Sequence, residues 1–165
     1  MSHETVVARL KAEAKPWPRG NRYEDFSPGR DFAHHWGRTV TEADNTLFSI
    51  LTLNYNPQYT NAEMARANGH PATPVNQLLV FNTVFGLSVE DLSEGGGPFL
   101  GVEDCEYLAP VFPGDTLTAR SRVVDARESD KRPAFGIVTW ATQGFNQRGE
   151  EVIRFRRTNL VRKRA

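Results

Sequence analysis

Between residues 41 and 51 the apolar positions recur at three- and four-residue spacing, which is typical of a helix with one apolar face. Thr41 stands at the start of this segment and Asp44 follows three residues later, a pattern that predicts a capped N-terminus. The polar turn NYNPQY follows at residues 54–59, and Pro57 prevents a helix from continuing through it. We therefore expect a helix that leads into a fixed polar corner, where polar side chains from the two sides of the turn converge.

The pattern predicts three other helices. Residues 75–89 (VNQLLVFNTVFGLSV) carry apolar side chains around most of the helix circumference, so we expect this helix to be buried nearly all round. A shorter helix is expected at residues 61–67, because Asn68 and Gly69 directly after it are residues that end helices. The third is a short N-terminal helix at residues 2–15.

Alternating apolar and polar residues predict strands in the rest of the chain. Four are expected in succession after a glycine-rich break, at residues 99–108, 116–125, 135–145 and 152–161. An irregular first strand is expected at residues 26–36. Strands that follow one another in this way pair antiparallel, and the apolar helix covers one face of their sheet. The expected fold is α+β, with a curved antiparallel β-sheet wrapped around one long buried helix.

A single helix covers only one face of such a sheet, so the other face or the edge strand needs a partner. We therefore expect a homodimer or a higher homo-oligomer. Prolines and a glycine at residues 15–21 predict a connecting loop. The expected organisation is an N-terminal helix and linker at residues 1–21, followed by a single domain at residues 22–165.

The composition excludes several classes of function. Lysine plus arginine and aspartate plus glutamate each number 20, so the balance gives no reason to expect binding to nucleic acid or to an acidic membrane. The basic segment at residues 154–165 is a local exception, which we interpret as a strand with a basic outer face. No apolar run reaches membrane-spanning length. The single cysteine, Cys105, cannot form an internal disulfide, and we expect it to be a small buried residue in a cytoplasmic protein.

Five segments resemble the MaoC-like family of hydratases and dehydratases: RYEDFSPGR at 22–30, GRTVTEADN at 37–45, NPQY at 56–59, APVFPGDTL at 109–117 and NQRGEEVIRFRRTNLV at 146–161. The resemblance covers nearly the whole chain. It implies a hotdog fold and the activity of an R-specific enoyl-CoA hydratase or a related dehydratase. Within the family, the chain is most similar to mesaconyl-CoA and itaconyl-CoA hydratases, which add water to branched or dicarboxylic acyl thioesters.

The resemblance also implies a site. In these hydratases an Asp begins the turn and a His ends it, and the pair holds the water and moves protons during addition to the double bond. A glycine amide at the start of the buried helix polarises the thioester carbonyl. By position these residues correspond to Asn54, Tyr59 and Gln77 of this chain, whereas the Asn56-Pro57 pair matches the family.

All three chemical positions therefore depart from the family pattern. Asn54 can orient a water or the substrate but cannot accept a proton. Tyr59 is a donor, because a tyrosine hydroxyl ordinarily has a pKa of about 10. We expect Asn54 and Tyr59 to be the catalytic residues. The expected substrate-binding residues are Asn56, Pro57, Val75, Asn76, Gln77, His70 and Arg132.

The histidines are the other candidates for the missing base. His70 stands in the loop before the buried helix and is one candidate, with an exposed loop histidine as the alternative. His34 and His35 are adjacent and point to opposite faces of a strand, so a packing or surface role is expected for them. Arg132 and the arginines of the last strand supply cations for coenzyme A phosphates or a second carboxylate, or else a solvated strand face.

The expected function is hydration or dehydration of an acyl thioester, carried by coenzyme A or by an acyl carrier. Two alternatives remain: a hotdog thioesterase, and a catalytically silent subunit that binds acyl-CoA or stabilises a heterodimer. The departures at residues 54, 59 and 77 favour the silent subunit. No zinc-ligand spacing, P-loop or dinucleotide motif is present, so we expect no metal and no cofactor.

Overall fold

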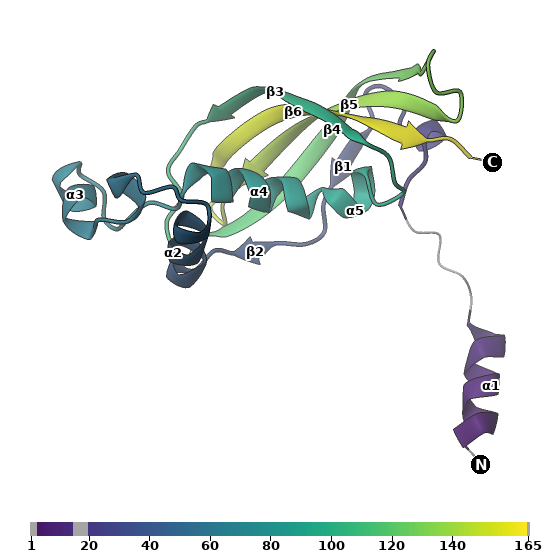
Figure 1. Ribbon diagram of the computed structural model, residues 1–165, viewed down its shortest axis with the longest axis horizontal. Helices are drawn as coiled ribbons and strands as arrows, with labels where there is room; N and C mark the ends of the chain where they lie inside the picture. The colour runs from purple at the N-terminus through teal and green to yellow at the C-terminus, as the bar shows by residue number, and fades with distance from the viewer. Residues whose placement is uncertain (1–2, 15–19, 165) are drawn as a thin grey trace.

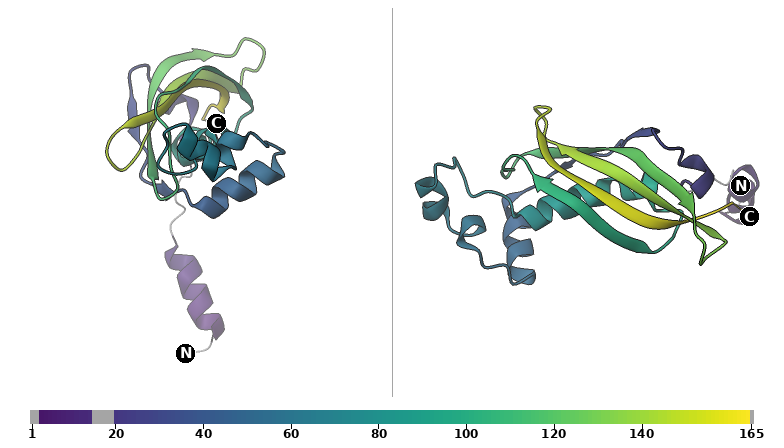
Figure 2. Two further views of the ribbon diagram at one scale, coloured as in Figure 1. Left: turned by 90° about the vertical axis from the view of Figure 1, so that its left-hand side faces the viewer. Right: turned by 90° about the horizontal axis from the view of Figure 1, so that it is seen from above.

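The computed structural model describes residues 3–14 and 20–164, and its main feature is a curved antiparallel sheet wrapped around one helix (Figures 1 and 2). The strands lie in the order β1-β4-β5-β6-β3, and β2 pairs with the start of β4. Their bounds are β1 (Asp31–Ala33), β2 (Arg38–Thr39), β3 (Phe99–Tyr107), β4 (Thr116–Glu128), β5 (Phe135–Phe145) and β6 (Glu151–Arg162). The α+β class and the four long strands are confirmed. Of the strand expected at residues 26–36, only β1 is present.

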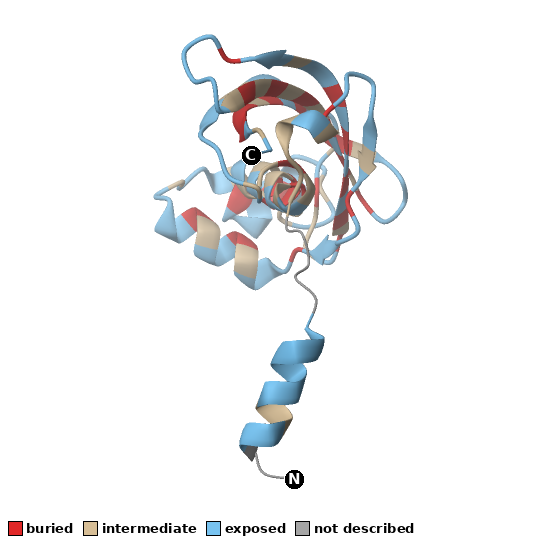
Figure 3. Ribbon diagram, turned by 90° about the vertical axis from the view of Figure 1, so that its right-hand side faces the viewer, coloured by how far each residue is buried: buried red, intermediate tan, exposed pale blue. Residues whose placement is uncertain are grey.

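The central helix is α4, and Figure 3 shows it end-on with the sheet curving around it. The helices are α1 (His3–Glu13), α2 (Glu42–Leu51), α3 (Ala62–Ala67), α4 (Gln77–Leu87) and α5 (Val89–Leu92), with 3₁₀ turns η1 (Tyr23–Asp25) and η2 (Pro57–Tyr59). Helix α1 lies apart from the sheet (Figure 1). The expected connecting loop falls largely at residues 15–19, which lie outside the described residues, and the division at residue 21 stays a prediction.

The core lies between α4 and the concave face of the sheet. Val80 and Val84 of α4 are buried in one cluster with Leu117, Ile153 and Phe155 from the strands. Burial alternates along β4 and β5, as a sheet with one covered face requires. A second cluster at the other end of the sheet is built around Trp140, and Phe26 packs edge-on against its ring at 5.0 Å.

Two helices expose apolar surface that the sequence pattern assigned to the interior. Leu78 of α4 is 50% exposed, and Asn82 and Gly86 on the same face are exposed too, so the expectation of a helix buried nearly all round is wrong. The physical reason is that the sheet of one chain reaches only part of the helix circumference. On α2 the apolar residues also face outwards, with Leu51 71% exposed, while the buried positions are Asn45 and Ser49.

Two expectations about single side chains are corrected by β-sheet register. Cys105 is exposed, because the pairing of β3 with β6 shifts between Glu103 and Glu106. Arg157 is fully buried instead of contributing to a solvated strand face, although Arg154 and Arg156 on the same strand are exposed as expected.

The buried Arg157 guanidinium lies over the Phe85 ring at 4.4 Å and near the Trp140 ring at 5.3 Å. Burial lowers the pKa of Arg157 to about 10. The side chain therefore stays charged at neutral pH while packed between aromatic rings, a contact that favours a cation.

Gly144 of β5 lies where Val84 of α4 packs against the sheet. A Cβ at this position would lie 2.6 Å from Cγ2 of Val84 and 2.8 Å from Cγ2 of Ile153. We expect Gly144→Ala to lower the free energy of unfolding by about 1–3 kcal/mol, because the added methyl overpacks the contact between helix and sheet. The matched control is Gly101→Ala on β3, where nothing lies within 4 Å of a Cβ. Urea unfolding of both variants measures the difference, and equal free energies would contradict the close packing.

Candidate active site

The polar corner after α2 places Tyr59 in the wall of a cavity of about 250 Å³. Tyr59 itself is buried, at the end of the 3₁₀ turn η2. The other polar residues that line the cavity are Gln58, His70, Gln77 and Tyr107. The apolar lining comes from Pro74, Val75, Val80, Leu108, Ala109, Pro110 and Val111. The cavity is therefore a mainly apolar recess at the start of α4, with a few polar groups on its wall, which is the usual make-up of a small-molecule site.

Local backbone geometry holds this corner. Helix α2 ends in a Schellman arrangement, in which the N–H of Asn54 donates to the carbonyl of Ser49 at 2.9 Å. Leu53 occupies the left-handed region at φ 56°, a conformation that costs a leucine about 1–2 kcal/mol. Asn56 then caps η2, since its Oδ1 accepts from the N–H of Gln58 at 3.1 Å, and Pro57 takes the first position of the turn.

A buried amide network ties the corner to α4. Asn45 of α2 donates from Nδ2 to the carbonyl oxygens of Tyr59 and Pro74, each at 3.2 Å. Its Oδ1 accepts from the backbone N–H of Asn76 at 2.7 Å. Asn76 in turn caps α4 and donates from Nδ2 to the Ser49 hydroxyl at 3.2 Å. All three polar side chains are buried, so the network sets the distance between the Tyr59 turn and the N-terminus of α4.

Both tyrosine hydroxyls at the cavity are donors at neutral pH. Burial raises the pKa of Tyr59, while the Gln77 backbone N–H, which donates to the Tyr59 hydroxyl, acts in the opposite direction. Burial together with the neighbouring Cys105 and Tyr59 raises the pKa of Tyr107 to about 12. Because both hydroxyls keep their protons, each can donate a hydrogen bond to a substrate oxygen.

The structure brings together only part of the set of residues predicted from the sequence. Tyr59, His70, Val75 and Gln77 line the cavity. Asn54 lies half-buried in the same corner but is not among the lining residues.

The four other predicted binding residues do not line the cavity. Asn56 and Pro57 shape the turn through the backbone. The backbone N–H of Asn76 donates to Asn45, whereas that of Gln77 donates to the Tyr59 hydroxyl at the cavity. Arg132 precedes the first residue of β5, whereas the cavity adjoins the other end of that strand, so the structure does not bring Arg132 to it.

The polar residues Gln58, Tyr107, Asn45 and Ser49 of this region were not singled out from the sequence. Tyr107 reaches the cavity from β3, and Asn45 and Ser49 support it from α2. The polar residues at positions 45 and 49 lie one turn apart in the helix and were a usable signal, because polar side chains that a helix buries need partners. No local signal in the sequence pairs Tyr107 with Tyr59.

The expected packing role of His34 is confirmed. Its Nδ1 lies 2.6 Å from Oδ2 of Asp91 and its Nε2 lies 2.8 Å from the Ser121 hydroxyl. Ser121 is itself buried and hydrogen-bonded to Thr142 at 2.8 Å, so this Asp-His-Ser chain is closed to a substrate. Burial lowers the pKa of His34, with Asp91 acting against it. His35 points outwards, 3.6 Å from Glu90.

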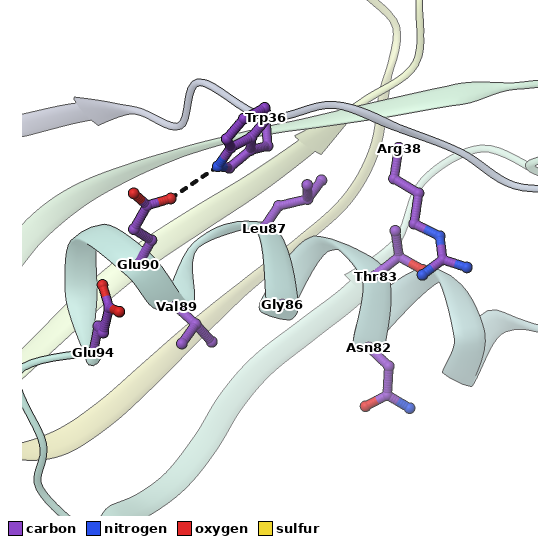
Figure 4. Close-up of a pocket in the computed structure, with 9 residues that line it drawn as sticks. All are labelled: Trp36, Arg38, Asn82, Thr83, Gly86, Leu87, Val89, Glu90 and Glu94. Atoms are coloured by element: carbon purple, nitrogen blue, oxygen red, sulfur yellow. Dashed lines mark hydrogen bonds between the residues drawn. The ribbon is translucent and has the colours of Figure 1, made fainter. Parts of the chain in front are cut away.

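A larger groove of about 500 Å³ runs along the outer side of α4 and α5 (Figure 4). Trp36 forms one wall and donates from Nε1 to Oε2 of Glu90 at 2.9 Å. Glu90 lines this groove and shares no cavity with Tyr59. The two sites are therefore separate, and the Tyr59 cavity is the one with the features implied by the resemblance.

Within residues 3–14 and 20–164, no cluster of three or more His, Cys, Asp or Glu side chains is arranged to hold a metal ion. In the same part of the chain, no helix has both the length and the apolar character required to cross a bilayer.

Comparison with curated proteins gives matches over most of this chain. A mesaconyl-CoA hydratase from Haloarcula hispanica is 39% identical over 147 residues, which is 88% of this chain and 41% of that protein. A beta-methylmalyl-CoA dehydratase from Chloroflexus aurantiacus is 36% identical over 155 residues, or 94% of this chain and 43% of that protein. This chain thus spans about two-fifths of the length of these relatives.

A solved structure of a MaoC domain dehydratase from Chloroflexus aurantiacus superposes with a TM-score of 0.86 at 35% identity, covering 93% of this chain and 43% of that one. The family model described as mesaconyl-CoA hydratase matches residues 2–165. The sheet wrapped around α4 agrees with these similarities. The chain belongs to the mesaconyl-CoA hydratase family, in the MaoC-like branch of the hotdog fold.

Proposed function

We propose that this chain is a hydratase or dehydratase of acyl thioesters, which interconverts enoyl-CoA and 3-hydroxyacyl-CoA in the cavity beside Tyr59. The observation that carries the proposal is the meeting of the Tyr59 hydroxyl and the Gln77 backbone N–H inside that cavity. The names of the relatives support the reaction class, since one is a mesaconyl-CoA hydratase and another a beta-methylmalyl-CoA dehydratase.

The chemistry follows from these two donors. When water adds to the β-carbon of an enoyl thioester, negative charge develops on the carbonyl oxygen. A carbonyl oxygen that enters between the Gln77 N–H and the Tyr59 hydroxyl replaces the hydrogen bond between these two groups and accepts one from each, so the developing charge is stabilised in a largely apolar recess. Tyr59 thus acts as a hydrogen-bond donor. We expect Asn54, which is half-buried in the same corner, to orient water or substrate.

A direct assay tests the reaction. Purified protein is incubated with crotonyl-, mesaconyl- and itaconyl-CoA, and the loss of enoyl absorbance is followed together with the release of free coenzyme A thiol. We expect enoyl absorbance to fall without thiol release for at least one ester. Thiol release would indicate a thioesterase instead. Binding of the esters without turnover would indicate the silent subunit, and a variant carrying Asn54→Asp and Tyr59→His would then test whether the pocket is retained.

The partner proposed for the exposed apolar surface is a second copy of this chain. Leu47, Ile50 and Leu51 of α2 and Leu78 of α4 are all at least half exposed. Strand β3 is the last in the sheet order, so its outer edge has unpaired backbone groups. The matched relatives are more than twice as long as the segment they share with this chain, and a second copy supplies comparable surface.

The mass in solution tests this partner. We expect light scattering to give twice the 18.5 kDa of the single chain, and the value to fall to one chain in Leu47→Glu/Leu51→Glu, because two charges would be buried in the interface. Val124→Glu on β4 is the control, since Val124 is also exposed but lies on another element. A wild-type protein of single-chain mass would contradict the proposal.

A further inference from the structure

His70 is held in a defined position by the end of helix α3. The N–H of His70 donates to the carbonyl of Ala65 at 3.0 Å, and the N–H of Gly69 donates to that of Arg66 at 2.9 Å. These two bonds form a Schellman motif, which requires the left-handed conformation that Gly69 adopts at φ 81°. The backbone of His70 is therefore set by a helix end, unlike that of a histidine on an unconstrained loop.

The imidazole also has a packing partner. It is half-buried, and its ring packs against Phe112 with the ring centroids 5.9 Å apart. Phe112 is fixed in its own loop, because its N–H donates to Oδ2 of the buried Asp115 at 3.0 Å. From this position His70 lines the same 250 Å³ cavity as Tyr59 and Gln77.

The chemistry of the other lining residues leaves His70 with a distinct role. The side chains of Gln58 and Gln77 are amides and do not take up a proton at neutral pH. Both tyrosines keep their protons, as their raised pKa values require. Among the residues that line the cavity, His70 alone carries an imidazole, the side chain that most often serves as a general base.

We propose that His70 is the general base of this site and takes over the proton transfer that the family pattern assigns to the turn. The proposal rests on the hydratase function proposed above. His70 accepts a proton from water as the water oxygen bonds to the β-carbon, and the C=C electron pair moves to form the enolate held by Tyr59 and Gln77. The imidazolium then returns the same proton to the α-carbon, so one H and one OH are added and the enzyme is regenerated.

His70→Ala tests the proposal, with His35→Ala as the matched control because His35 is an exposed histidine outside the cavity. We expect His70→Ala to reduce kcat by about 10²–10⁴-fold, the usual loss for a positioned acid–base group. Its dissociation constant for butyryl-CoA, a saturated ester that cannot react, stays within about threefold of wild type. Added imidazole restores part of the lost kcat in His70→Ala, since the removed ring leaves a space in an existing cavity.

The outcomes separate this inference from the proposed function. If wild type turns over no enoyl-CoA, the proposed function fails and the role of His70 fails with it. If wild type is active and His70→Ala retains its kcat, only the role of His70 is overturned. A loss of kcat that imidazole does not restore, accompanied by loss of butyryl-CoA binding, also overturns the role of His70 as a base and assigns the residue to the structure of the pocket.

Discussion

Tyr59→Phe is expected to lower kcat for enoyl-CoA hydration by about 10²–10³-fold, the effect of removing one preorganised donor from a developing oxyanion. The substitution deletes only the hydroxyl, so the buried ring and the backbone carbonyl that accepts from Asn45 remain. The Kd of butyryl-CoA should change much less than kcat, because the hydroxyl matters most when charge develops on the thioester oxygen.

The control for this experiment is Tyr55→Phe, which removes a hydroxyl from an exposed tyrosine of the same corner. Its kcat should equal that of wild type, and circular dichroism of both variants verifies the fold. A kcat for Tyr59→Phe within about threefold of wild type would show that the hydroxyl takes no part in the chemistry, and the placement of the thioester carbonyl would have to be abandoned.

Asn45→Ala is expected to have the largest effect on stability among polar substitutions near the site. It removes three hydrogen bonds and leaves the N–H of Asn76 and the carbonyl oxygens of Tyr59 and Pro74 without this partner in a buried region. Each unsatisfied buried group costs about 1–3 kcal/mol, so the free energy of unfolding should fall by about 3 kcal/mol or more. For a domain of this size that loss lowers Tm by roughly 6–12 °C.

Asn82→Ala is the matched control, since Asn82 is exposed on α4 and its replacement should change the free energy of unfolding by about 0.5 kcal/mol or less. Urea unfolding and thermal melts measure both variants. If Asn45→Ala were as stable as Asn82→Ala, the amide network would not be what joins the Tyr59 turn to α4, and the position of the corner would need another cause.

The strands and helix ends were predictable because their signals are local. The alternation of apolar and polar residues at 135–145 predicted β5 with its bounds. The capping box of Thr41 and Asp44 is present at the start of α2. Asn68 and Gly69 end α3 as expected. These features depend on neighbouring residues in the chain, whose preferences act before any tertiary contact forms.

Burial was less predictable, because it depends on what the rest of the chain covers. The apolar residues of α2 and Leu78 of α4 match an interior pattern but are exposed in the single chain. Conversely, Arg157 follows the strand alternation onto the covered face and is buried among aromatic rings. Composition alone could not distinguish Arg157 from Arg154 and Arg156 on the same strand.

The order of residues along this chain was sufficient to predict the α+β class, the four long strands and the polar corner, and to show the likeness to the MaoC-like family. These features depend on periodicity, capping and turn residues, which are properties of contiguous segments. It was not sufficient for the site. The cavity unites Tyr59 from the corner, His70 from the end of α3, Gln77 from α4 and Tyr107 from β3. Only folding brings these residues together, because the sheet curves around α4 and a buried amide network sets the spacing between elements that are distant in the sequence.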